Sequence, residues 1–238
     1  MNITGDLETA TKSLLESGRE WCTVTGEQKM EGIGFAWKTV GRLLDERHME
    51  YTNIEILYDN SGAPVVKVLN PSGGEIIPKI LISLSDEAGF RVCLAVQSEN
   101  LKRNELLGVG IDLVDVHDAA GILNISPERF KKCFSPAEWK ILSGIRREER
   151  NQYVSLLLAG REAAFKSMSC VYDKYRKENH NRPLKVSFMD FYFPGGKKAV
   201  PRRLTGNICK REKIEIESGF VSWGSLAGSV AVCRRTCK

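Results

Sequence analysis

The sequence predicts an α+β protein of two similar halves, residues 1–105 and 106–238. Some segments carry apolar residues at three- and four-residue spacing, which is typical of helices, and others are short apolar runs, which favour strands. Helix, hairpin and two closing strands follow in that order in residues 27–97 and again in 146–235. The 238 residues, 42% of them apolar and 27% charged, suffice for two such halves.

In the first half we expect helices over residues 6–18 and 27–47, followed by four short strands. The second helix carries Trp37, Val40 and Leu44 along one face. The runs IEILY and PVVKVL flank the turn-forming DNSG, which predicts a hairpin. After NPSGGEIIP, the runs ILISLS and FRVCLAVQ predict two further strands, and the polar SENLKRNE connects the halves.

The second half begins with LLGVGIDLVDV, a nearly continuous apolar run that predicts a buried strand with Asp112 inside it. SPERF and SPAEW each place Ser-Pro before a glutamate, a pattern typical of helix N-termini. Residues 148–169 are expected to form a longer helix, because Tyr153, Leu157 and Met168 share one face. Strand-like runs at LKVSFMDFYF, KIEIE, GFVSW and SVAVCRR complete this half.

Composition narrows the classes of function. The formal net charge of +5 favours an acidic partner, but the basic clusters lack interleaved aromatic residues and a nucleic-acid-binding motif, so we expect no nucleic-acid partner. The chain shows neither a long apolar stretch nor a secretion signal, so we expect a cytoplasmic protein with no membrane partner. Seven scattered cysteines without CxxC spacing are expected to be reduced core thiols.

The sharpest candidate site combines Asp112 in the buried strand with Glu162 and Lys166 on the long helix. Four residues apart, Glu162 and Lys166 project from one side of that helix, and Arg161 lies beside them. Two carboxylates suit Mg²⁺, which keeps its other positions for water and phosphate oxygens, and a nearby lysine would neutralise phosphate charge. Two ordinary alternatives remain open: a solvated Glu162–Lys166 pair, and an arginine that satisfies Asp112.

The segments GVGIDLVDV, ERFKKCFSPAEW and LLLAGREAAFKSM, in this order, resemble the three signature segments of the 4'-phosphopantetheinyl transferase superfamily, especially holo-acyl-carrier-protein synthase. The resemblance implies that two such α+β halves pack side by side as a covalent pseudo-dimer, monomeric as a chain, with one ligand cleft between them. It implies that Asp112 and Glu162 bind Mg²⁺ or Mn²⁺. It also implies that Lys166 and Arg161 contact the phosphates of coenzyme A. Asp115, three residues after Asp112, follows the holo-synthase pattern.

The first half is similar to the same family through GFAWKTVGRLL, IEILYDNSGAPVVKVL and ISLSDEAGFRVCLAV. The similarity implies that this half supplies the nucleotide pocket, through Pro64 of the hairpin and through Ser83, Ser85 and Asp86 at a strand end. Ser83 and Ser85 can equally be ordinary strand-end hydrogen bonders. Because Thr39 stands in the place of a metal-binding glutamate and this half has no GID strand, its own metal site is expected to be dead.

The implied function is transfer of 4'-phosphopantetheine from coenzyme A to a serine of an apo acyl or peptidyl carrier protein, with Mg²⁺ and release of 3',5'-ADP. Glu162, directly or through one water, is the expected proton acceptor. The expected partner is an acidic carrier protein, for example of fatty-acid or polyketide biosynthesis. The alternative is a catalytically inactive module of a larger synthase that binds a carrier protein or coenzyme A, which the departures at Arg161, Ala63 and Asp86 favour.

Overall fold

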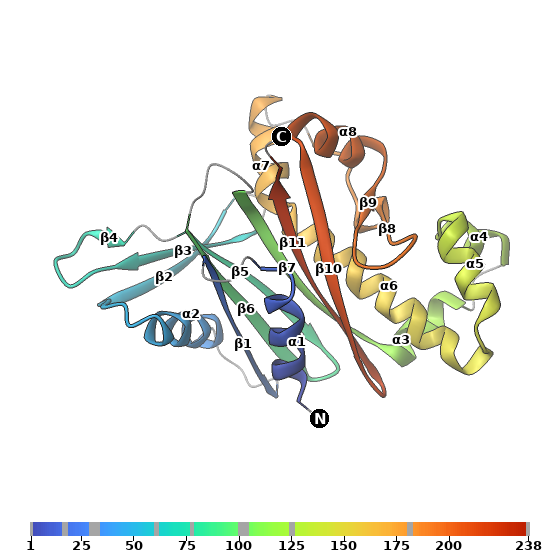
Figure 1. Ribbon diagram of the computed structural model, residues 1–238, viewed down its shortest axis with the longest axis horizontal. Coiled ribbons are helices and arrows are strands. Elements are labelled where there is room, and N and C mark those ends of the chain that lie inside the picture. Colours follow the sequence, from blue (N-terminus) through green and yellow to red (C-terminus); the bar gives the residue numbers. More distant parts are fainter. Residues whose placement is uncertain are drawn as a thin grey trace.

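The computed structural model describes residues 2–15, 19–28, 34–59, 62–76, 79–99, 105–123, 127–179 and 183–236 (Figure 1). The first half contains α1 (Ile3–Lys12), β1 (Glu20–Gln28), α2 (Gly34–Glu46), β2 (Asn53–Tyr58), β3 (Pro64–Leu69), β4 (Glu75–Ile76), β5 (Lys79–Glu87) and β6 (Phe90–Ser98). The second half contains β7 (Glu105–Asp115), α3 (Val116–Leu123), α4 (Pro127–Lys132), α5 (Pro136–Gly144), α6 (Arg147–Ser167), α7 (Ser169–Glu178), η1 (Phe188–Asp190), β8 (Phe191–Tyr192), β9 (Val200–Pro201), α8 (Arg203–Glu212), β10 (Ile214–Trp223) and β11 (Leu226–Arg235).

Each half contributes one three-stranded antiparallel sheet. In the first sheet β6 lies between β1 and β5, and in the second β11 lies between β10 and β7. In each half, the sheet consists of one long early strand, β1 or β7, and the hairpin that ends the half, β5–β6 or β10–β11. A helix, α2 or α6, follows the opening strand and packs on its own sheet, and a smaller sheet comes before the closing hairpin. This shared order agrees with the α+β repeat that the sequence predicts.

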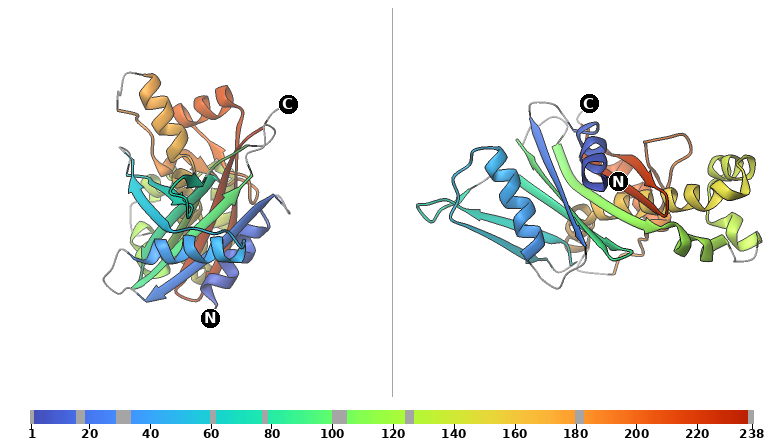
Figure 2. Two further views of the ribbon diagram at one scale, coloured as in Figure 1. Left: turned by 90° about the vertical axis from the view of Figure 1, so that its left-hand side faces the viewer. Right: turned by 90° about the horizontal axis from the view of Figure 1, so that it is seen from below.

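The two sheets enclose a central apolar core, with α2 and α6 on their outer sides (Figure 2). Residues of both halves build the central core, and α1 covers it by packing against β1, β10 and β11. The Asn2 side chain caps α1 by accepting the Gly5 N–H, and Leu7 is fully buried. Trp223 Nε1 donates to Asp6 Oδ2 at 2.7 Å. Helix α1 thus belongs to the first half in sequence but ties both halves together.

The halves also meet along a seam, which we define as the contact between β5 and β7. Two serine side chains of β5 bind the backbone of β7 there. Ser83 Oγ accepts the N–H of Ile111 and Ser85 Oγ accepts the N–H of Leu113, each at 3.1 Å. These bonds satisfy buried backbone donors that would otherwise be costly to leave unpaired. The seam therefore fixes how β5 lies against β7.

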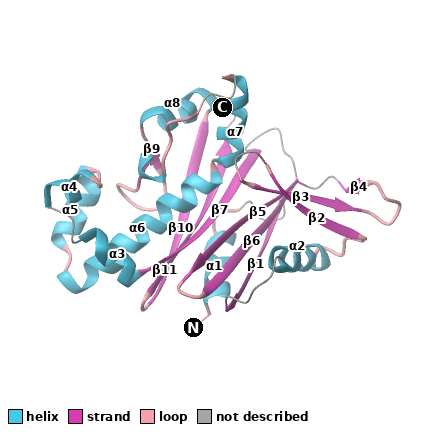
Figure 3. Ribbon diagram, turned by 180° about the vertical axis from the view of Figure 1, so that it is seen from behind, coloured by secondary structure: helices cyan, strands magenta, loops and turns pink. Residues whose placement is uncertain are grey.

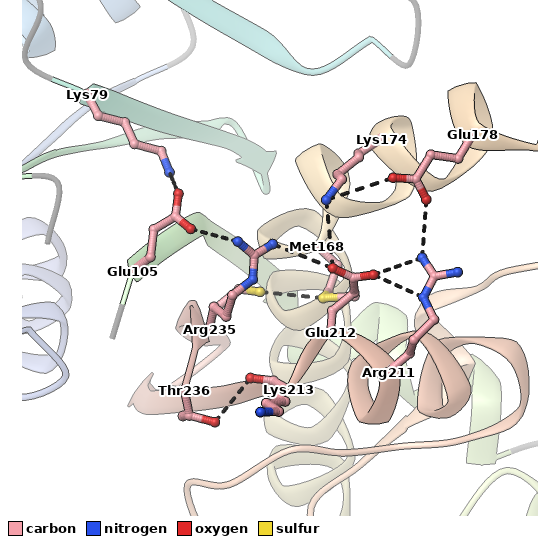
Figure 4. A network of polar contacts seen from close by, with 11 residues as sticks. Lys79, Glu105, Met168, Lys174, Glu178, Arg211, Glu212, Lys213, Arg235 and Thr236 are labelled. Carbon is pink, nitrogen blue, oxygen red and sulfur yellow. Dashed lines mark hydrogen bonds and ion pairs between the residues drawn. The ribbon is translucent and has the colours of Figure 1, made fainter. Parts of the chain in front are cut away.

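The other end of the seam carries a network of charged side chains (Figure 4). Lys79 of β5 donates to the carbonyl of Leu106 at 2.6 Å and pairs with Glu105 at 3.5 Å. Glu105 pairs with Arg235 at 3.0 Å, and Arg235 pairs with Glu212 of α8 at 3.6 Å. This network links the first half to the end of the second sheet and to α8.

Two glycines of GVGID allow α6 to lie directly on β7. A Cβ atom on Gly108 would lie 2.0 Å from the carbonyl oxygen of Ser167, and one on Gly110 would lie 1.9 Å from that of Ala163. Both separations are far inside van der Waals contact, so only glycine fits at either position. The close approach brings the face of α6 that carries Glu162 and Lys166 to the part of β7 that carries Asp112.

The structure differs from the predicted elements in several places. Helices α3, α7 and α8 were not predicted, and KIEIE and GFVSW form the single strand β10. Strand β1 was not predicted; Cys22, Thr23 and Val24 are all buried because α1 and α2 both cover the strand, which removes the expected alternation. Helix α1 ends at Lys12 and α2 begins at Gly34; residues 16–18 and 29–33 lie outside the described residues. LKVSFMDFYF forms only η1 and the two-residue β8, because a capping box at Ser187 begins a helical turn.

The cysteines largely follow the expectation of buried thiols. Cys22, Cys93, Cys209 and Cys233 are buried and free, and burial raises the pKa of Cys22 and of Cys209 to about 12. Two cysteines differ from this expectation, since Cys133 is only partly buried and Cys170 is free and exposed. Among the described helices, none has the length and apolar character needed to cross a membrane.

Candidate functional site

Two adjoining cavities lie beside the seam between the halves. The first, about 610 Å³, is lined by residues of α2, the β2–β3 hairpin, β5 and α6. The second, about 470 Å³, is lined by residues of β5, β7, α6 and η1. Leu84, Asp86, Glu162 and Lys166 belong to the walls of both. Figure 3 shows α6 running along the second sheet, beside β7. A ligand that filled both cavities would therefore pass over Glu162 and Lys166.

Asp112 is a buried carboxylate with specific partners. Its Oδ1 accepts from Lys166 Nζ at 2.8 Å and from Ser85 Oγ at 3.0 Å. Burial raises the pKa of Asp112 to about 6; Lys166 opposes this rise, and the neighbouring Glu162 adds to it. The alternative that an arginine satisfies Asp112 is wrong, because a lysine and a serine do so.

Glu162 shares the wall of the second cavity with Asp112, and the two carboxylates are close enough for Glu162 to raise the pKa of Asp112. Within the described residues, no three histidine, cysteine, aspartate or glutamate side chains are arranged to hold a metal ion. A pair of carboxylates still fits Mg²⁺, because this ion commonly takes one or two of them and fills its other positions with water and phosphate. In hydrogen bonds to described residues, Asp112 uses only Oδ1. These oxygen donors fit a divalent cation.

Lys166 binds both halves at once. Its Nζ donates to Leu84 O of β5 at 3.1 Å, to Ile111 O of β7 at 3.2 Å and to Asp112 at 2.8 Å. An ammonium group has three donors, so all three are used. The lysine pairs with Asp112 across the fold, which contradicts the alternative of a solvated pair with Glu162. Its side chain is 28% exposed at the border of the cavities, where its charge acts on both.

The two serines predicted for the ligand pocket lie at the seam. Ser83 lines the first cavity and Ser85 the second. Both hydroxyls accept backbone N–H groups of β7, and Ser85 also donates to Asp112. The ordinary alternative of strand hydrogen bonders is therefore confirmed, and direct contact with a ligand stays a prediction.

The first cavity holds the remaining residues predicted for the nucleotide pocket. Pro64 lies in its wall, next to Ala63. Asp86 pairs with Arg91 across the β5–β6 hairpin, with Nε–Oδ1 at 2.6 Å. The sequence prediction missed Arg91, which also lines this cavity and brings a positive charge to it.

Residues 108–204 match the family model described as the 4'-phosphopantetheinyl transferase superfamily. This part of the chain is similar to that superfamily. The segment begins at the close approach of β7 and α6 and includes Asp112, Glu162 and Lys166. The candidate site therefore lies within it. Among proteins with curated descriptions, no sequence matches this chain.

Solved holo-acyl-carrier-protein synthases are similar to part of the chain. The holo-ACP-synthase from Plasmodium yoelii is 18% identical and covers 57% of this chain and 100% of its own, with a TM-score of 0.43. The ACPS–CoA complex from Chronobacterium ammoniagenes is 18% identical over 55% of this chain and 98% of its own, with a TM-score of 0.41. The acyl carrier protein synthase from Mycobacterium tuberculosis is 23% identical and covers 54% of this chain and 96% of its own, with a TM-score of 0.34.

Within the superfamily segment, Arg161 does not face either cavity. Its side chain is buried, and its guanidinium donates to Glu138 Oε2 at 3.0 Å and to the carbonyl of Cys133 at 2.7 Å. The ring of Tyr192 lies 4.9 Å from the guanidinium carbon. Because successive residues of a helix point roughly 100° apart, Arg161 turns into the core while Glu162 faces the cavities. This placement corrects the expectation that Arg161 contacts phosphate.

The first half has a strand and a helix, β1 and α2, that correspond in order to β7 and α6. Thr39 of α2 lies next to Thr25 of β1, with their hydroxyl oxygens 2.5 Å apart. Helix α1 packs on the same strand, where Glu8 accepts the N–H of Val24 at 3.3 Å. Glu46 of α2 also meets this strand, where it accepts from the Thr23 hydroxyl at 2.8 Å. The expectation of a dead metal site in this half stays a prediction.

Sequence reasoning also missed Glu87 and Phe188, which line the second cavity. Glu87 ends β5 at a tight turn formed by Ala88 and Gly89, both with positive φ. The short loop between ILISLS and FRVCLAVQ was a sequence signal for this turn. That signal did not indicate that the turn lies beside β7 and α6 of the second half.

Proposed function

We propose that the chain transfers 4'-phosphopantetheine from coenzyme A to a serine of an apo carrier protein and releases 3',5'-ADP, with Mg²⁺ held by Asp112 and Glu162. The observation that carries the proposal is the position of these two carboxylates. They share one cavity wall at the seam, within the segment that is similar to the 4'-phosphopantetheinyl transferase superfamily.

The cavities suggest how the ligand would lie. The nucleotide of coenzyme A would occupy the first cavity, against Pro64 and near the positive charge of Arg91. The pyrophosphate would lie at the border of the cavities, over Glu162. The second cavity, with Leu113, Val114 and Phe188 in its wall, would take the pantetheine arm and admit the serine of the carrier.

The chain's own side chains would orient the reacting groups. Ser85 and Lys166 hold Asp112 in one position, so the carboxylate is set before a ligand arrives. Lys166 keeps its positive charge at the border of the cavities, where it offsets phosphate charge without giving up its bonds at the seam. A bound Mg²⁺ would neutralise charge on the pyrophosphate. The serine oxygen forms a bond to the phosphorus that carries pantetheine as the bond to 3',5'-ADP breaks.

The proposed partner is an acidic carrier protein, because the chain has a formal net charge of +5. Opposite charges would speed the encounter more than they would tighten the complex. We propose that the chain acts as a monomer in the cytoplasm, without nucleic acid or membrane.

The proposal is tested by incubating the protein with coenzyme A, Mg²⁺ and a panel of apo carrier proteins, followed by mass spectrometry of each carrier. We expect one carrier to gain one phosphopantetheine group, and the Asp112→Ala variant to give no gain. A folded wild-type protein that modifies no carrier would contradict the proposal.

A second candidate is an inactive module that binds coenzyme A or a carrier protein. The observation in its favour is that all three N–H donors of Lys166 bind atoms of the protein itself, which leaves none for a phosphate. Calorimetric titration with coenzyme A separates the two functions. Binding that needs Mg²⁺ and is lost in Asp112→Ala supports the enzyme, whereas binding unaffected by Mg²⁺ supports the module.

A further inference from the structure

The second cavity contains one carboxylate that has neither an ion pair with a described side chain nor a proposed role in holding the metal. Five titratable residues line this cavity: Asp86, Glu87, Asp112, Glu162 and Lys166. Asp86 pairs with Arg91, and Asp112 pairs with Lys166. Glu162 is proposed as a metal ligand, and the donors of Lys166 are all used. Glu87 has no ion pair with any described residue.

Glu87 comes from the half opposite to the proposed metal ligands. It ends β5 at the tip of the β5–β6 hairpin, while Asp112 and Glu162 belong to β7 and α6. Its carboxylate accepts a hydrogen bond from the backbone of Asp115, so the tip of the first half is held against the end of β7. The carboxylate thus lies on the other wall of the cavity that would receive the carrier serine.

The turn that holds Glu87 is backbone-constrained. Ala88 has φ +50° and Gly89 has φ +74°. A positive φ is unfavourable for alanine, so the hairpin keeps an uncommon backbone conformation next to Glu87. The turn and the bond from Asp115 together fix where the carboxylate can lie.

Resting on the proposed function, we propose that Glu87, and not Glu162, accepts the proton of the attacking serine hydroxyl. The serine O–H bond breaks and its proton moves to the Glu87 carboxylate, while the serine oxygen forms its bond to phosphorus. The bond from phosphorus to 3',5'-ADP breaks, and the leaving group takes the electron pair. The proton then passes from Glu87 to solvent. A carboxylate bound to a cation is a weaker base than one without a cation, which favours Glu87 over Glu162.

The surroundings of Glu87 support a basic carboxylate. Partial burial raises the pKa of Glu87, and negative charges nearby raise it further, against the bond from Asp115. The charges that act on it come from Asp112, Asp115 and Asp118. Asp86, which pairs with Arg91, and Glu162 and Lys166 line the same cavity.

The test compares Glu87→Gln with the wild type in the carrier-modification assay. The amide keeps the size of the side chain and an oxygen for the Asp115 N–H, but it cannot take the proton. We expect kcat to fall about 100-fold or more, the range typical of a general base. The dissociation constant for coenzyme A with Mg²⁺, measured by calorimetry, should change by less than about twofold, because Glu87 does not bind the nucleotide.

Two further variants separate a base from a merely structural residue. Asp118→Asn removes a negative charge near Glu87 but no lining residue of the cavity, and it should keep kcat within about threefold. Glu87→Ala should regain activity when formate is added, because a small carboxylate can fill the space and accept the proton. Formate should have no such effect on the wild type.

The outcomes are distinguishable. A Glu87→Gln variant with wild-type kcat overturns the inference while the transferase function stands. A Glu87→Gln variant that no longer binds coenzyme A, together with a Glu87→Ala variant that formate does not rescue, assigns Glu87 a structural role and also overturns it. A folded wild type that modifies no carrier overturns the proposed function and this inference together.

Discussion

At the scale of single residues, position on an element decides whether a charged side chain serves a ligand or the core. Arg161 and Glu162 are neighbours on α6, yet Arg161 is buried against Glu138 while Glu162 lines both cavities. Asp112 is buried too, but it lies in the wall of a cavity, where its carboxylate pairs with Lys166. Burial alone therefore does not separate a structural charge from a functional one.

We expect Asp112→Asn to be more stable than the wild type at pH 8 in a buffer with a metal chelator, and the gain to shrink toward pH 4. The pKa of Asp112 is about 6 in the folded protein and usually 3.8. A raised pKa contributes stability that is complete below the unfolded value and is lost as the pH rises through the folded value. The change between these limits is about 3 kcal/mol. Urea unfolding at several pH values measures it, and a difference that is independent of pH would contradict the expectation.

We expect Arg161→Met to destabilise the protein by about 3 to 5 kcal/mol, because it leaves Glu138 buried without its partner. Urea unfolding measures the loss. The exposed Arg147 provides a matched control, and Arg147→Met should change stability by less than about 0.5 kcal/mol. Coenzyme A affinity of the folded Arg161→Met protein should equal that of the wild type. A lower affinity for coenzyme A with unchanged stability would show that Arg161 contacts the ligand.

At the scale of elements, the site depends on how β5, β7 and α6 lie together. Gly108 and Gly110 let α6 approach β7, and Ser83 and Ser85 connect β5 to β7. Lys166 then reaches carbonyl groups of both strands. The glycines and serines of these motifs therefore determine how closely α6 and β5 lie to the backbone of β7, whether or not a ligand is bound.

We expect Gly110→Ala to destabilise the protein by about 2 kcal/mol or more, because the new methyl group would lie 1.9 Å from the carbonyl oxygen of Ala163 and would force α6 away from β7. Gly144→Ala is the control, since its new methyl group would meet no atom of a described neighbour within 4 Å and alanine favours a helix. Thermal unfolding of both variants provides the measurement. Equal melting temperatures would show that α6 does not need the close approach.

At the scale of the whole molecule, the two halves are similar in order but not independent. The central core takes residues from both sheets, and α1 packs against strands of both halves. The cavities likewise take walls from both. The boundary near residue 105 therefore separates two structural repeats more than two self-sufficient folding units.

We expect residues 1–105 and 106–238, expressed separately, to unfold without a cooperative transition, whereas the full chain unfolds in one step. Each fragment would expose its side of the central core to water, and apolar burial is the main favourable contribution to folding. Circular dichroism during urea titration, with a dye that binds exposed apolar surface, tests this. A fragment that unfolds cooperatively at the same urea concentration as the full chain would contradict it.

The sequence by itself determined what depends on short-range periodicity. It predicted the β2–β3 hairpin, the strands β5 and β6, the buried strand around Asp112 and the helix on which Glu162 and Lys166 share a face, because hydrophobic spacing follows the local backbone. Only the tertiary structure decided the rest. The covering of β1 by two helices, the burial of Arg161, the bonds from Ser85 and Lys166 to Asp112, and the position of Glu87 all depend on contacts between segments far apart in the chain. Such contacts are set by packing and by the need to pair buried polar groups, which the spacing of residues does not record.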